Sequence, residues 1–122
     1  MFITEDKRVG SYYLEFQYCK TDSPIKHNKI DIDNIKHWEY DSLLINADEF
    51  NGFYKLYSDI FNCALLANGE IGFDSCGINY YDKKTSENIL QKLNVVNDEY
   101  NNLILWLQKA VENFKGFYIL GI

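Results

Sequence analysis

The chain has 122 residues, a length typical of one domain, and its 47% hydrophobic content is ample for a single core. The net charge is −6, and eleven of the twelve basic residues are Lys, with Arg8 as the one Arg, so charge and composition both argue against nucleic-acid binding. No apolar run approaches the ~18 residues of a membrane-spanning helix, which argues against insertion in a membrane.

The cysteines are odd in number and widely spaced, at Cys19, Cys63 and Cys76. That pattern is a poor disulfide framework and is typical of free thiols in a reducing compartment. The first residues, Met1–Asp6, lack the basic-then-apolar pattern of a secretory signal. We therefore expect a cytoplasmic protein.

The first predicted element is a strand from Ser11 to Cys19. Its side chains alternate with a period of two, which is typical of a strand with one face in the core. The apolar set is Tyr12, Leu14, Phe16 and Tyr18, and Tyr13, Glu15 and Gln17 lie between them. Thr21–Pro24 then predicts a turn. The polar, weakly periodic stretch His27–Ile45 is expected to be strand and loop, with Ile30, Ile32 and Leu44 in short strands.

A long helix is predicted from about Ala47 to Leu66, because its apolar residues follow helical spacing. Asn46 is a suitable residue to cap its start, and Asn68-Gly69 to stop it. An alternative ends the helix near Phe61 and makes Cys63–Leu66 a strand, with Asn68-Gly69 as a hairpin turn. We take the long helix as the primary prediction.

Four further elements are predicted in the second half of the chain. Apolar residues among glycines make Glu70–Tyr81 a bent strand or a short hairpin. A short helix follows at 86–93, and an apolar stripe then predicts a helix over 97–113. Phe117–Ile122 is a continuous apolar tail, which we expect to be a strand inserted in the sheet.

Together these elements predict one α+β domain over residues 1–122. Its antiparallel sheet is built from Ser11–Cys19, Glu70–Tyr81 and Phe117–Ile122. Two long helices, near 47–66 and 97–113, and one short helix, near 86–93, pack against this sheet.

Signatures of catalysis or of ligand binding are absent from the sequence. Nothing in the spacing brings Cys76 to His27 or His37, as a thiol nucleophile would require. The histidines and cysteines lack zinc-ligand spacing, and Asp31-x-Asp33 lacks the glycine and the final Glu of a calcium loop. We expect no catalytic residue, no metal and no cofactor.

Acidic residues gather beside aromatic ones in one part of the chain. The set predicted to contact a partner is Asp31, Asp33, Trp38, Glu39, Tyr40, Asp41, Asp48 and Glu49. Carboxylates steer a basic partner and exposed rings anchor it, so this segment favours binding to a basic protein. The alternative is a solvated loop with its rings turned inward, in a protein whose acidity serves solubility alone.

Three segments of the C-terminal half carry a family resemblance: Gly69–Asp82 (GEIGFDSCGINYYD), Leu103–Leu107 (LILWL) and Gly116–Ile122 (GFYILGI). Together they resemble the small immunity proteins that accompany bacterial toxins of contact-dependent growth inhibition. The resemblance implies a non-catalytic cytosolic antidote that binds the C-terminal nuclease domain of a cognate toxin and blocks its active site. It assigns no role to any individual residue.

Two other classes of function remain open. One is a small enzyme or ligand-binding domain with a pocket near Cys76. The other is a structural adaptor subunit that forms a homo-oligomer. For the immunity protein we expect a cognate basic toxin domain as the partner, no nucleic acid or membrane, and a monomer or weak dimer.

Overall fold

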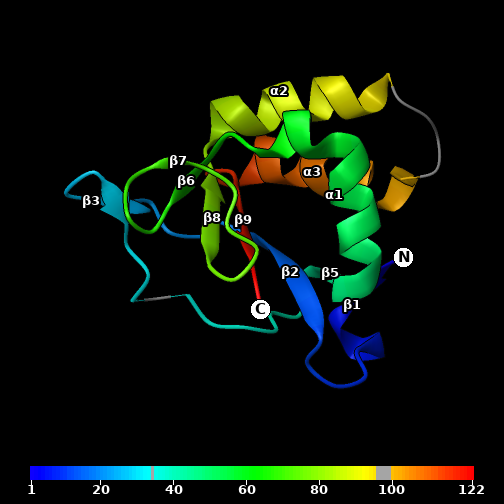
Figure 1. The fold of residues 1–122 in the computed structure, drawn as a ribbon. Coiled ribbons are helices and arrows are strands. Elements are labelled where there is room, and N and C mark those ends of the chain that lie inside the picture. Colours follow the sequence, from blue (N-terminus) through cyan, green and yellow to red (C-terminus); the bar gives the residue numbers. More distant parts are fainter. Residues whose placement is uncertain (34, 96–99) are drawn as a thin grey trace.

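The structure is a computed structural model that describes residues 1–33, 35–95 and 100–122. These residues form a seven-stranded antiparallel sheet with the order β1-β5-β2-β9-β8-β6-β7, a separate β3–β4 hairpin and three α-helices (Figure 1). The strands are β1 Phe2–Thr4, β2 Tyr13–Tyr18, β3 Ile25–Lys26, β4 Lys29–Ile30, β5 Leu43–Asn46, β6 Ala64–Leu66, β7 Ile71–Gly72, β8 Ile78–Tyr81 and β9 Phe117–Leu120. The helices are η1 Glu5–Lys7, a single 3-10 turn, and α1 Ala47–Phe61, α2 Lys83–Asn94 and α3 Asn101–Asn113. The predicted α+β class with an antiparallel sheet is confirmed.

One face of the sheet carries the main core and all three α-helices. Leu14, Phe16 and Tyr18 of β2 point to this face, as their period of two requires. They pack with apolar residues of α1, α2 and α3, and Phe16 stacks on Phe117 of β9 at 6.0 Å between ring centroids. Figure 1 shows α2 and α3 side by side above the strands, with α1 next to them.

The opposite face of the sheet is covered by the chain between β2 and β5. Ile30 from the β3–β4 hairpin packs there in a second apolar cluster with Cys19, Tyr80 and Tyr118, and Ile35 packs against it. His27 and Asn28, both with positive φ, form the tight turn of that hairpin. The segment that contains most of the predicted partner-binding residues is therefore the cover of this second face.

The primary prediction for the first long helix is confirmed at its start, Ala47, but wrong at its end. Helix α1 ends at Phe61, and β6 is a strand that pairs with β7 on one side and β8 on the other. Backbone pairing on two sides outweighs the helical spacing of this short apolar segment. Gly69, at φ +89°, closes the turn between β6 and β7, as the alternative interpretation predicts.

Other boundaries also differ from the prediction. Glu70–Tyr81 is two strands, β7 and β8, which pair with β6 and are separated by a loop. Helix α2 is longer than 86–93, because Asp82 caps it by accepting a hydrogen bond from the Thr85 N–H at 2.8 Å. Residues 97–99 of the last predicted helix lie outside the described part of the chain. Strand β9 ends at Leu120, and Ile32 lies in no strand.

Besides β6, two strands were not predicted as elements of the main sheet. Strand β1 is only three residues long and forms an edge, and β5 lies between β1 and β2. Leu44 of β5, expected in a short strand, is fully buried opposite Glu15. None of the helices in the described part of the chain has the length and apolarity to span a bilayer.

Gly116 allows β9 to begin directly after the turn that follows α3. Its φ is +94°, and an added Cβ would lie 2.0 Å from the Tyr81 carbonyl oxygen. We predict that Gly116→Ala lowers the free energy of unfolding by at least about 2 kcal/mol, measured by urea denaturation. Gly52→Ala is the matched control, because Gly52 lies within α1 with nothing near its Cβ position. The control should raise stability by up to about 1 kcal/mol, and equal effects of the two substitutions would contradict this account.

Candidate functional site

Glu15 of β2 is a carboxylate with 0% exposure on the covered face of the sheet. Its Oε2 accepts hydrogen bonds from Ser42 Oγ at 2.6 Å, from Gln17 Nε2 at 3.0 Å and from the Glu39 N–H at 3.1 Å. Its Oε1 accepts from the Trp38 N–H at 2.8 Å. A buried carboxylate is tolerated only with such partners, so these bonds hold residues 36–42, the anchored loop, against the sheet.

The anchored loop has one further hydrogen bond to β2 and one within itself. Gln17 Nε2 also donates to the Lys36 carbonyl at 2.6 Å, and the Ser42 N–H donates to the Glu39 carbonyl at 3.1 Å. Trp38 has φ +67°, a left-handed conformation that is costly for a residue with a large side chain. The hydrogen bond from the Trp38 N–H to Glu15 offsets that cost. His37 Nδ1 lies 3.5 Å from Glu15 Oε1 and forms an ion pair with it when protonated.

A hollow of about 290 Å³ lies between the anchored loop and the covered face of the sheet. We call it the acid hollow; it is lined by Gln17, Tyr18, Lys20, Thr21, Asp31, Ile35, Glu39 and Tyr118. Asp31 and Glu39 are both half-buried. Among the described residues, neither carboxylate has a cation within ion-pair distance. The acid hollow thus presents two carboxylates that the chain itself does not neutralise by contact.

A second hollow, of about 540 Å³, lies on the helix side of the anchored loop. We call it the aromatic hollow; it is lined by Tyr18, Tyr40, Asp41, Trp106, Lys109, Asn113 and Phe114. The Tyr18 ring stacks on Trp106 at 4.1 Å and on Phe114 at 4.4 Å. Burial, with a smaller contribution from Asp41, raises the pKa of the Tyr18 phenol well above its usual value, so this ring stays neutral.

Tyr40 and Asp41 border the aromatic hollow, one residue beyond Glu39 in the acid hollow. Tyr40 is 81% exposed. The Trp106 Nε1 donates to the Asp41 carbonyl at 2.8 Å, which ties this point of the loop to α3. A large exposed ring on an immobilised backbone is the kind of residue that anchors protein interfaces.

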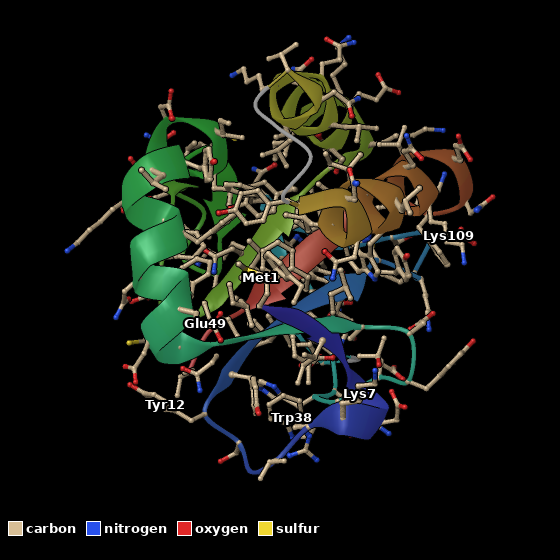
Figure 2. The ribbon with its side chains drawn as sticks, turned by 90° about the vertical axis from the view of Figure 1, so that its right-hand side faces the viewer. Met1, Lys7, Tyr12, Trp38, Glu49 and Lys109 are labelled. Atoms are coloured by element: carbon tan, nitrogen blue, oxygen red, sulfur yellow. The ribbon has the colours of Figure 1, made fainter. Side chains whose placement is uncertain are left out.

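The predicted partner-binding residues fall into two groups. Asp31, Asp33, Trp38, Glu39, Tyr40 and Asp41 lie on the cover of the second face, whereas Asp48 and Glu49 begin α1. Glu49 pairs with the N-terminal amine of Met1 at 2.9 Å, and Asp48 accepts from Tyr12 Oη at 3.4 Å. Figure 2 shows Glu49 at the base of α1 beside Met1, and Trp38 lower in the view near η1.

Sequence reasoning did not identify several residues that shape the two hollows. Lys20 and Tyr118 line the acid hollow, and Trp106 and Phe114 line the aromatic hollow. Alternation along β9 could have placed Tyr118 on the face opposite Phe117. No local pattern indicates that α3 approaches the anchored loop.

The cysteines and histidines are dispersed. Cys76 is exposed on the loop before β8, where its N–H donates to Asp74 Oδ1 at 2.9 Å and its Sγ lies 3.9 Å from Ser75 Oγ. Cys19 is buried, and burial raises the pKa of its thiol despite a contact with Tyr118 Oη at 3.4 Å. Within residues 1–33, 35–95 and 100–122, no group of three or more His, Cys, Asp or Glu side chains could hold a metal ion.

The arrangement is suited to holding a cation. Carboxylates in a partly desolvated hollow attract an ammonium or guanidinium group more strongly than carboxylates in open water do. An adjacent ring adds apolar contact area and a cation–π surface.

Comparisons with protein-family models, with curated proteins and with solved structures find no match to this chain.

Glu15→Gln tests whether the buried carboxylate holds the loop. The amide group places an N–H donor where the carboxylate accepts from the Trp38 N–H or from the donors on Oε2. We predict a loss of about 2 kcal/mol in the free energy of unfolding, measured by urea denaturation at neutral pH. Glu70→Gln, the same change at an exposed position, should stay within about 0.5 kcal/mol of the parent. Similar values for the two variants would show that Glu15 is not the anchor.

Proposed function

We propose that the chain is an immunity protein that binds a cognate toxin domain, a nuclease, and neutralises it. The observation that carries the proposal is the pair of carboxylates in the acid hollow, Asp31 and Glu39, next to the exposed ring of Tyr40. The pair supports recognition of a basic side chain of the partner. The family resemblance of the C-terminal half supports the choice of partner.

Electrostatic complementarity connects this surface to a nuclease. A domain that cuts nucleic acid presents a basic groove, because it must hold a polyanion. A net charge of −6 steers such a domain toward the chain, and the acid hollow is a specific site for one of its basic side chains. When bound in this way, the chain covers the basic groove of the toxin domain and excludes its nucleic-acid substrate.

The surface is also pre-organised for binding. Glu15 and Gln17 hold the anchored loop from below, and Trp106 holds it from the helix side. A loop that is already ordered loses little conformational entropy when a partner docks. Tight binding through a small surface is therefore compatible with this structure.

The test is complex formation with the product of the adjacent upstream gene, on co-expression and then with the purified proteins. We predict a dissociation constant in the nanomolar range at about 0.1 M salt, weakening as salt is added. The double variant Asp31→Asn, Glu39→Gln should weaken binding by at least about 30-fold, because both carboxylates of the acid hollow are lost.

The matched control is Asp59→Asn, Glu70→Gln, which removes the same charge from exposed positions outside the site. It should weaken binding by less than about threefold. If the chain forms no complex with the toxin, the proposed function is wrong. A complex weakened equally by both double variants would place the interface elsewhere.

A further inference from the structure

Lys20, directly after Cys19, places its ammonium on the border between the two hollows. Its Nζ lies 3.0 Å from both carboxylate oxygens of Asp41. The same Nζ lies 5.0 Å from the centroid of the Tyr40 ring, in the geometry of a cation–π contact. A cation of the chain itself therefore occupies the carboxylate and the ring that border the aromatic hollow.

Trp38, a half-buried ring of the anchored loop, is contacted in the same way. The Arg8 guanidinium lies over the Trp38 ring, 4.2 Å from its centroid, and its Nε pairs with Glu5 at 3.3 Å. Tyr40 and Trp38, the two large rings of the loop, are thus each contacted by a cation of the same chain. This repetition shows the kind of group that these rings accept.

We propose that Lys20 is an intramolecular competitor, which occupies Asp41 and the Tyr40 ring until a cationic side chain of the partner displaces it. This inference rests on the proposed function and adds a specificity-determining residue to it. A partner must offer a group that holds Asp41 and Tyr40 better than a tethered ammonium does. Weak polycations of the cell are thereby disfavoured.

The competitor can leave its position without disrupting the fold. The Lys20 side chain is 38% exposed, and exposed ion pairs contribute little to stability. Asp41 stays in place when its carboxylate is released, because its carbonyl remains bonded to Trp106 Nε1. Burial lowers the pKa of Lys20, but the hydrogen bond and the charge of Asp41 raise it more, so Lys20 stays charged. Displacement therefore exchanges one cation for another.

A structural role for Lys20 makes the opposite prediction. If the ion pair served to hold Asp41 for binding, removal of Lys20 would loosen that point of the loop and weaken binding. Competition predicts that removal of Lys20 tightens binding. The sign of the change separates the two roles.

The probe is a fluorescein-labelled nona-lysine peptide, titrated with the intact chain at about 0.1 M salt and followed by fluorescence anisotropy. We predict that Lys20→Met lowers the dissociation constant about fivefold, because Asp41 and the ring are freed. Lys26→Met is the matched control, since it removes the same charge from the exposed β3. The control should change affinity by less than about twofold.

A double-mutant cycle shows whether the gain comes from Asp41. In an Asp41→Asn background, Lys20→Met should change affinity no more than Lys26→Met does. The competitor role of Lys20 is wrong if Lys20→Met and Lys26→Met have equal effects in the parent chain. It is also wrong if Lys20→Met weakens binding of the peptide. This result is independent of the proposed function, which fails instead if the chain forms no complex with the toxin.

Discussion

The buried carboxylate of Glu15 organises the face of the sheet that the helices leave open. A charge with no exposure is stable only if donors surround it, and those donors are backbone and side-chain groups of the anchored loop and of β2. Hydrogen bonds to a charged acceptor contribute about 1.5–3 kcal/mol each. The groups that offset the cost of burying the charge are therefore the same groups that order the loop. Burial of Glu15 and ordering of the loop form a single constraint.

That constraint determines the shape of the candidate site. Glu39 donates its N–H to Glu15 while its own carboxylate lines the acid hollow, so the anchor and the binding group belong to one residue. Tyr40 follows immediately, and its ring is exposed to solvent beside the aromatic hollow. Lys20 then supplies the cation that this exposed pair, Tyr40 and Asp41, attracts from within the chain.

The local elements were predictable to the extent that their residues were periodic. Alternation predicts β2, and a helical stripe predicts most of α3 and the first part of α1. Cys63–Leu66 has no decisive period, so only its pairing with β7 and β8 determines that Ala64–Leu66 is a strand. Alternation also placed Glu15 opposite the core face, but it could not show that a later segment would bury this side.

The site itself was partly predictable. The composition of 31–41 indicated an acidic and aromatic surface, but its geometry depends on contacts between residues far apart in sequence. Trp106 reaches Asp41 from α3, and Lys20 reaches it from the end of β2. Asp48 and Glu49 share the composition of that segment but not its location, because β5 separates them from it in the chain.

Hydrogen exchange tests the role of Glu15 most directly, because the amide protons of Trp38 and Glu39 point at its carboxylate. Residues of an ordinary solvated loop exchange at nearly the rate of an unfolded chain. The structure predicts that these two amides exchange at least about a hundredfold more slowly than an unfolded chain. The exchange rate of the Tyr40 amide, one residue on, provides the comparison within the same loop. Unprotected amides at Trp38 and Glu39 would contradict the anchored loop and the pre-organised surface built on it.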